Sequence, residues 1–320
     1  MRLGQLVALT IGMLSVPAML AQSRPAVEQQ WAAGKYVVVV KSATSQSGRK
    51  EGPSSIESEH GYELAVQEPD ANGQKVRVVF SRLALRAKGG GMEGIQHDTD
   101  KPAGEDRYSF QWRSKAMIGS PMEAIIAPGG KIGDVSGCDE IVRKAGAADD
   151  PMGARTVLGM CRSTVTSALV PLVFHFPEKP LVKGYAWTRN DPMDMWIMGA
   201  MKMAQDYKVK GVEDTPDGSV AEIDFTAKNT SDKLAATDED SAKFAQVLRV
   251  EEVSYQGAGT IRVNLRTKMV MSTKLHMKTR MKGTSLADGG NLPFDFATEG
   301  DSEVVVTPAK NNPTSSTGPG

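Results

Sequence analysis

IRVNLRTKMVMSTKLHMKTRM, residues 261–281, alternates apolar and basic residues on either side of a short polar break. Alternation with a period of two places successive side chains on opposite faces of a β-strand. The break at residues 266–268 predicts a turn, so the segment predicts an antiparallel hairpin with one buried face and one solvated face. The predicted buried set is Ile261, Val263, Leu265, Met269, Met271, Leu275, Met277 and Met281, and the predicted exposed set is Arg262, Arg266, Lys274, His276, Lys278, Arg280 and Lys282.

The same alternation recurs along most of the chain and indicates that strands dominate the fold. It is found at residues 62–66, 76–80, 193–207, 221–227 and 247–255, and a continuous β-branched run at 36–40 predicts a further strand. After Phe80 the apolar positions shift by one residue, which is typical of a β-bulge near Ser81 that bends the strand. We therefore expect an α+β fold: a long, bent, mainly antiparallel β-sheet, half-barrel-like, with two short helices inserted in the middle of the chain.

Helical signals are confined to the middle of the chain. Ser136 is a candidate cap for a first helix, and Asp150-Pro151 is a favourable start for a second one. The second helix is ended by Pro171 and carries an apolar stripe, which consists of Val157, Leu158, Cys161, Val165, Ala168 and Leu169. We expect a disulfide between Cys138 and Cys161 that ties the two helices together. The alternative is two buried thiols that pack as small apolar residues.

The first 23 residues have the pattern of a secretory signal peptide. Arg2 precedes the uncharged apolar run Leu3–Leu20, and small residues lead to a cleavage site after Ser23. The run is also just long enough for an uncleaved membrane anchor, which is the alternative. We expect an exported protein that is periplasmic or extracellular after cleavage.

The remaining chain is expected to form one folded unit followed by a tail. We expect residues 24–283 to be a single β-rich domain. Mobile loops are expected near 42–59, 88–106 and 229–241, where polar residues and glycines gather. From residue 284 onwards Gly, Pro, Ser, Thr and Asn accumulate, so residues 284–320 are expected to be a mostly disordered C-terminal tail.

Composition and spacing give no sign of catalysis. Lys plus Arg and Asp plus Glu both number 38, and a neutral exported protein is not expected to bind nucleic acid. The four histidines are isolated in sequence, and no Cys or His spacing indicates a metal site. Carboxylates cluster at 98–100 and 238–240, but neither cluster has the Gly and distal Glu of a calcium loop. We therefore predict no catalytic, metal or cofactor-binding residues, and we expect that the chain is not an enzyme.

Two asymmetries in the predicted strands bear on function. The basic face of residues 262–282 could make a peripheral contact with an anionic envelope surface, or it could pair with Glu222 and Asp224 of another strand. The methionines of the sheet could fill gaps in a core, or they could line a surface that accepts varied apolar ligands. We favour the structural interpretation of both features.

The segment Phe176-Pro-Glu-Lys-Pro-Leu-Val-Lys-Gly-Tyr-Ala-Trp187 resembles a Pro-x-x-Pro-Val-x-x-Gly-x-x-Trp signature. We associate this signature with a family of uncharacterised, exported, β-rich bacterial proteins of unknown function. Gly257-Ala-Gly259 and the two final strands fit the same pattern, so the resemblance covers about residues 35–283. More remotely, two helices among long bent strands resemble the unclosed half-barrel of bacterial lipoprotein and lipid carriers, in which helices cover an apolar concave face.

One main hypothesis and two alternatives follow. We expect a non-enzymatic exported envelope protein that binds an apolar or amphiphilic small molecule between the curved sheet and the helices. The alternatives are a structural or protein-interaction module without a ligand pocket, and a hydrolase whose catalytic residues come from distant loops. The expected lining of the ligand site is Leu158, Val165, Leu169, Met201 and Met203.

Overall fold

The structure is a computed structural model of the 320-residue chain. It describes residues 31–48, 52–90, 95–101, 114–127, 130–194, 199–236, 242, 245–246, 248–286 and 291–309. The predicted signal peptide, the carboxylate cluster at 238–240 and the end of the predicted tail from residue 310 lie outside these ranges.

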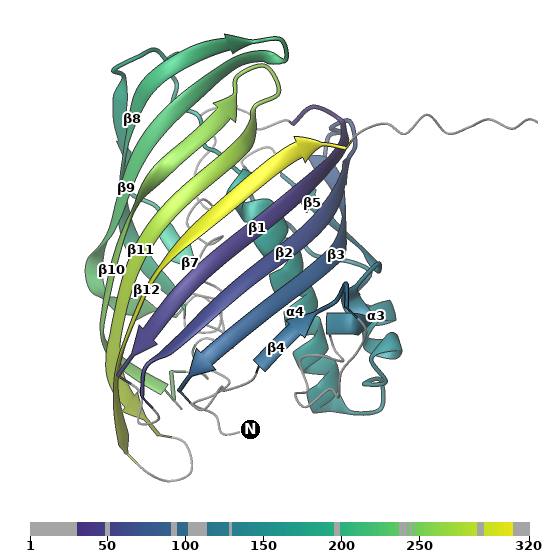
Figure 1. Cartoon of the computed structure of the whole chain (residues 1–320), viewed down its shortest axis with the longest axis vertical. Coiled ribbons are helices and arrows are strands. Elements are labelled where there is room, and N and C mark those ends of the chain that lie inside the picture. Colours follow the sequence, from purple (N-terminus) through teal and green to yellow (C-terminus); the bar gives the residue numbers. More distant parts are fainter. Residues whose placement is uncertain are drawn as a thin grey trace, which may run out of the picture.

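Most of the described residues belong to one twelve-stranded antiparallel sheet, which is curved and unclosed (Figure 1). The hydrogen-bonded order of the strands is β4-β3-β2-β1-β12-β11-β10-β9-β8-β6, with β5 beside β3 and β7 beside β8. The strands are β1 (Gly34–Ser47), β2 (Ser54–Val66), β3 (Gln74–Gly89), β4 (Ile95–Asp98), β5 (Pro121–Ile126), β6 (Ala186–Arg189), β7 (Pro192–Asp194), β8 (Ala200–Thr215), β9 (Gly218–Ala235), β10 (Leu248–Asn264), β11 (Met269–Ser285) and β12 (Leu292–Pro308).

Three helices of the described residues lie between β5 and β6 in the sequence. They are α3 (Cys138–Lys144), α4 (Pro151–Leu169) and the short 3-10 helix η2 (Val170–Leu172). α4 begins at a proline, which is favourable in the first turn of a helix. It lies on the concave side of the sheet and packs mainly against α3, β5 and β3 (Figure 1). The expected α+β fold, with a bent antiparallel sheet and mid-chain helices, is therefore confirmed.

The predicted bend near Ser81 is present in β3. Gly61 pairs with Arg82, whereas the next residue, Tyr62, pairs with Phe80, so Ser81 is an extra residue in its strand. An extra residue of this kind bends a strand and increases its twist. The bulge explains why the inward positions of β3 change phase after Phe80.

The predicted hairpin consists of the end of β10 and of β11, paired along their whole length. The Asn264 side chain accepts the backbone N–H groups of Arg266 and Thr267 at 2.9 Å each, which stabilises the turn. Met271 and Leu265, which were predicted to be buried, and Lys282, which was predicted to be exposed, depart from the prediction because all three are half-buried. Val263 pairs with Val270 and Arg262 with Ser272, so Met271 is an extra residue in β11 and interrupts the inward–outward alternation of its side chains.

The predicted disordered tail is wrong over residues 292–308, which form β12. This strand pairs with β1 on one side and with β11 on the other, and it joins the two ends of the chain into one sheet. Its inward residues Thr298, Ser302, Val304 and Val306 are buried. Two of these four inward residues are polar, so the alternation of apolar and polar residues that predicted the other strands does not extend through β12.

The predicted loops are also strands over much of their length. β1 runs to Ser47 and β2 begins at Ser54, β3 reaches Gly89, and β9 reaches Ala235. β4 lies within the predicted loop at 88–106. Ladder hydrogen bonds satisfy the backbone of these polar segments whatever the character of their side chains.

Two local predictions are wrong as well. Residues 193–207 do not form one strand, because β7 turns back on β8 and places Met193 opposite Met201. Ser136 does not cap α3 through its side chain: Gly137 lies at the N-cap with φ +88°, and no side-chain hydrogen bond caps the helix. The backbone of Ser136 instead bridges to Glu123 of β5.

Candidate functional site

The concave side of the sheet, which we call the inner face, carries the hydrophobic core. Buried apolar side chains of the long strands, β5, α3 and α4 form one connected cluster. Along β1, for example, Val38 and Val40 point inward and are buried, whereas Lys41 is exposed on the opposite outer face. An apolar ligand would therefore have to bind on the inner face.

The expected lining residues lie within this core. Val165, Leu169, Met201 and Met203 are at most 1% exposed, and Leu158 is half-buried against the cluster. In the described part of the chain, α4 packs mainly against β5 and β3, whereas the two methionines belong to β8. The structure thus places these residues in packed positions, and their role as ligand lining stays a prediction.

Cys138 and Cys161 form a disulfide, with their Cα atoms 5.9 Å apart. The bond joins the first residue of α3 to the middle of α4. Both cysteines are buried beneath the helix pair. A structural disulfide is typical of a protein that folds in an oxidising compartment.

A row of mostly polar residues crosses the inner face. Five inward residues are cross-strand neighbours on β2, β1, β12, β11 and β10, and we call them the polar row: Ser54, Gln46, Thr298, Thr279 and Tyr255. Six residues before Gln46 in β1, Val40 belongs to a mainly apolar row that continues through Val304, Thr273, Ile261, Ile223 and Val209. At about 3.3 Å per residue, the two rows are roughly 20 Å apart. On β10, β11 and β12 the polar row is also adjoined on its other side by Val253, Met281 and Phe296, so it interrupts an otherwise apolar face.

Two hydroxyl groups of the polar row have no hydrogen-bond partner. The side chains belong to Ser54 and Thr298, which are 5% and 4% exposed. Inward hydroxyls nearby are satisfied: those of Ser42 and Ser58 lie 2.8 Å apart, and Ser302 donates to the Lys41 carbonyl at 3.0 Å. A buried hydroxyl without a partner costs about 1–3 kcal/mol. These two groups are thus candidates for contact with a ligand.

Sequence reasoning missed the polar row because it followed apolar residues only. Gln46 is nevertheless in phase with Val38 and Val40, and Thr298 is in phase with Val304 and Val306. Extending the apolar phase into the adjoining polar residues would have placed both side chains on the inner face.

Three of the four histidines lie in unrelated environments. Nδ1 of His60 is 3.1 Å from the Tyr62 hydroxyl, and burial lowers the pKa of His60 to about 4. Nε2 of His175 is buried without a partner, and His276 lies on the outer face, 2.9 Å from Asp301. Across the described ranges, no three His, Cys, Asp or Glu residues gather in a way that could hold a metal ion.

The fourth histidine makes a contact that the sequence analysis did not predict. Nε2 of His97 lies 3.2 Å from the Ser114 hydroxyl. β4 and the segment after Ser114 both adjoin β3, which brings the two residues together. Ser114 is only 1% exposed, so the protein itself covers this hydroxyl group.

The signature segment at 176–187 fastens β6 to the sheet. The Trp187 ring stacks between those of Tyr185 and Tyr207, with centroid distances of 5.4 and 5.0 Å. Gly184 has a φ of +85°, which glycine adopts without steric cost, and its N–H donates to the Val209 carbonyl at 2.9 Å. The residues of the signature therefore build a turn and an aromatic stack.

On the outer face, the basic residues of β11 pair with acidic residues of neighbouring strands. Lys278 lies 2.8 Å from Glu299 and holds the pKa of that carboxyl below its usual range. Arg280 donates two hydrogen bonds to Asp295, at 2.9 and 2.8 Å, and lowers its pKa in the same way. The acidic partners of Lys278 and Arg280 come from β12 and that of Lys282, Glu252, comes from β10, whereas Glu222 pairs with Lys210. Pairing thus accounts for much of the basic face, although through different strands from the one expected.

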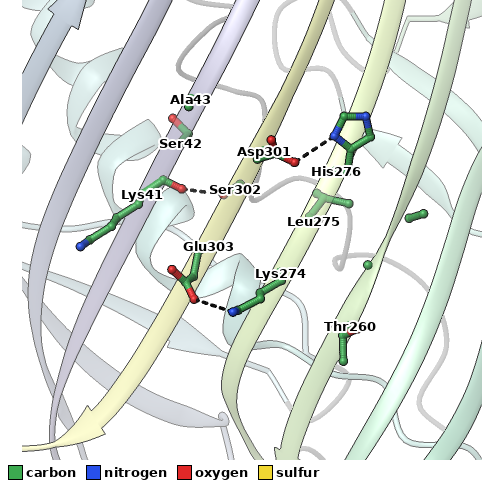
Figure 2. A pocket seen from close by; sticks show the side chains of 12 residues that line it. Lys41, Ser42, Ala43, Thr260, Lys274, Leu275, His276, Asp301, Ser302 and Glu303 are labelled. Atoms are coloured by element: carbon green, nitrogen blue, oxygen red, sulfur yellow. Dashed lines mark hydrogen bonds and ion pairs between the residues drawn. The ribbon is translucent and has the colours of Figure 1, made fainter.

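Figure 2 shows a hollow of about 500 Å³ on the outer face of β1, β12, β11 and β10. Ala43, Ala258 and Gly259 form part of its lining, and the paired side chains of Lys274 and Glu303 lie beside them. A second hollow of about 440 Å³ continues along the same strands. Lys274 pairs with Glu303 and His276 with Asp301 within the first hollow, and Lys41 pairs with Glu59 of β2, so no charged residue of the lining calls for an ionic ligand.

Comparisons with known proteins give a family and three remote structural likenesses. No curated protein matches the chain. The chain is similar to lipovitellin, in a structure concerned with its lipid–protein interactions, at 11% identity and a TM-score of 0.45 over 88% of this chain and 26% of that one. It therefore spans about a quarter of the lipovitellin chain.

Two channel structures are less similar. They are the COG4313 outer membrane channel from Pseudomonas putida F1 (11% identity, TM-score 0.18, 90% of this chain and 100% of that one) and OccK2 from Pseudomonas aeruginosa in complex with glucuronate (7% identity, TM-score 0.15, 88% and 98%). All three TM-scores are below 0.5. None of the described helices is long and apolar enough to cross a membrane.

The resemblance carried by the signature segment is confirmed at the level of a family. The matching family model covers residues 72–288, which include the signature, both final strands of the predicted hairpin, the disulfide and most of the inner face. Because the match extends over more than half of the sequence, the chain belongs to the Family of unknown function (DUF6263).

Proposed function

We propose that this chain is an exported, non-enzymatic envelope protein that binds an apolar or amphiphilic ligand on its inner face. The supporting observation is the shape and chemistry of that face: a bent sheet gathers apolar side chains from most of its strands on the concave side, opposite the apolar stripe of α4. Several of them are methionines, whose flexible side chains adapt to varied apolar shapes. Export is supported by the disulfide and by the predicted signal peptide.

The test is binding of an uncharged apolar fluorescent probe, N-phenyl-1-naphthylamine, to the purified protein. We expect saturable binding that weakens in Leu158→Trp or Leu169→Trp, because a larger side chain on the stripe of α4 takes space from the ligand. The matched control is Val182→Trp, since Val182 is exposed outside the core. Absence of saturable binding would reject the proposal.

The second candidate is a structural or protein-interaction module without a ligand site. The observation that favours it is the complete burial of Val165, Leu169, Met201 and Met203. If side chains fill the inner face, the three Trp variants should differ only in stability, and no probe should bind. Probe binding therefore separates the two functions directly.

The proposal also states that the chain is not a hydrolase. Ser114, whose hydroxyl lies beside His97, is the serine at which this statement can be tested. Because the Ser114 hydroxyl is buried, we expect no labelling by a fluorophosphonate, a reagent that reacts with activated serines. Labelling that disappears in both Ser114→Ala and His97→Asn would instead establish the hydrolase alternative.

A further inference from the structure

The polar row is the part of the inner face that packing alone does not explain. We propose that it binds the uncharged, hydrogen-bonding head group of an amphiphile whose apolar part lies on the remainder of the inner face. This inference rests on the proposed function, because it assigns the head-group chemistry of a ligand bound on the same face.

The first argument is the position of the unpartnered hydroxyls. Gln46 lies between Ser54 and Thr298 on adjacent strands, and neighbouring strands are about 4.8 Å apart. The two hydroxyls are thus roughly 10 Å apart across the row, a span that a head group with several hydrogen-bonding groups can bridge. Because each hydroxyl both donates and accepts, the pair suits alcohols and esters.

The second argument is the contrast with neighbouring rows. The hydroxyls of Ser42, Ser58 and Ser302 find partners within the sheet, whereas those of Ser54 and Thr298 do not. Inward hydroxyls near the polar row can therefore form hydrogen bonds within the sheet. Of the three inward hydroxyls without a partner, those of Ser54 and Thr298 share the polar row, and that of Thr273 lies in the apolar row between Val304 and Ile261.

The third argument concerns charge. Among the described inward residues of β1, β2, β10, β11 and β12, none carries a charge at neutral pH, and the Lys, Arg, Asp and Glu residues of these strands lie on the outer face. His60 is the inward titratable residue of β2 with a basic side chain, and burial holds its pKa near 4. Among the described inward residues of these strands, a carboxylate or phosphate at the polar row would thus meet no cation to replace its hydration, so an uncharged head is favoured.

The experiment compares two competitors with the same acyl chain and different heads. The bound N-phenyl-1-naphthylamine is displaced from the purified protein at pH 8 by 1-monooleoylglycerol or by oleate. We expect the monoacylglycerol to act at a concentration at least about tenfold lower, because the oleate carboxylate would be buried unpaired. Equal competition, or stronger competition by oleate, would overturn the inference.

Single substitutions locate the head group. Thr298→Val and Ser54→Ala should each weaken competition by the monoacylglycerol about fivefold, the effect of one hydrogen bond, and leave oleate unchanged. Thr298→Ser keeps the hydroxyl and should keep the discrimination. The matched control is Thr273→Val: the Thr273 hydroxyl is also buried and unpartnered, but it lies outside the polar row, so the ratio between the two competitors should not change.

The outcomes distinguish this inference from the proposed function. If the probe does not bind the wild-type protein at all, the proposed function fails and takes the inference with it. If the probe binds, but Thr298→Val retains the wild-type ratio or Thr273→Val loses it, the inner face binds a ligand and the assignment of the polar row is wrong.

Discussion

The Cα atoms of Cys138 and Cys161 are 5.9 Å apart, and the disulfide between them fixes the start of α3 to the middle of α4. Cys161 lies on the apolar stripe that α4 turns toward the sheet, beside Val157 and Val165, which are fully buried. The position of α4 on the inner face is thus held by a covalent bond as well as by packing.

Replacing both cysteines by serine should lower the free energy of unfolding by about 3 kcal/mol, because the crosslink limits the freedom of the unfolded chain. The measurement is urea denaturation without reductant, and wild-type protein in reductant should approach the stability of the double variant. Alkylation of the unfolded wild-type protein without reductant should add no label. Two added labels would contradict the disulfide.

The His60 ring makes stability depend on pH. Burial lowers its pKa from 6.5 to about 4, so the folded protein keeps the ring neutral while the unfolded chain binds a proton below about pH 6.5. The unfolded state then holds more protons between pH 6.5 and 4, and the free energy of unfolding falls as the pH decreases through this window. We expect a loss of roughly 3 kcal/mol by pH 4, measured by urea denaturation at several pH values.

His60→Gln should remove most of this loss, since glutamine has no proton to gain. His276→Gln, on the exposed outer face, is the control and should retain it. The ion pair Arg280–Asp295 does not obscure the window, because the pKa of Asp295 is held below its ordinary value of 3.8 and its contribution is lost only at lower pH. The pKa of Glu299 is lowered from an ordinary value of 4.5, so its contribution begins to be lost at the lower end of the window and is retained as a slope in both variants. An unchanged pH profile in His60→Gln would show that another group is responsible.

The sequence predicted those parts of the fold in which apolar and polar residues follow the period of a strand or a helix. Residues 261–281 revealed a hairpin because one side of it is basic and the other apolar, and the phase change after Phe80 revealed the bulge at Ser81. The cysteines could be paired because the helical stripe around Cys161 was clear. In each case a local pattern carried the information.

The central strand β12 could not be recognised in this way. Its inward residues change from Val304 and Val306 to Ser302 and Thr298, so composition alone resembles a tail. What makes it a strand is non-local: β1 and β11 each offer it a complete ladder of hydrogen bonds. The polar row was missed for the same reason, because its residues come from five strands and become neighbours only through the register of the sheet.

The aromatic stack of the signature segment should contribute directly to stability. Trp187→Ala removes the ring that separates Tyr185 from Tyr207, and we expect the free energy of unfolding to fall by about 3 kcal/mol. Trp187→Phe keeps an aromatic ring and should cost less than half as much. Thermal unfolding followed by circular dichroism measures both, and equal losses would mean that stacking at this position contributes little.

Substitutions at two glycines test the register in which β10 and β11 pair. A Cβ atom added at Gly259 would come within 2.0 Å of the Lys274 carbonyl oxygen on β11, so the two strands can approach as closely as they do only because this position has no side chain. We expect Gly259→Ala to lower the free energy of unfolding by more than about 2 kcal/mol, since the backbone must shift.

Gly211 of β8 is the matched control: nothing lies within 4 Å of an added Cβ, and its φ is not in the left-handed region. Gly211→Ala should therefore be neutral or stabilise by up to about 1 kcal/mol through the unfolded state. Urea denaturation of both variants measures the difference, and similar stabilities for the two would mean that β10 and β11 do not approach each other at Gly259 in this register.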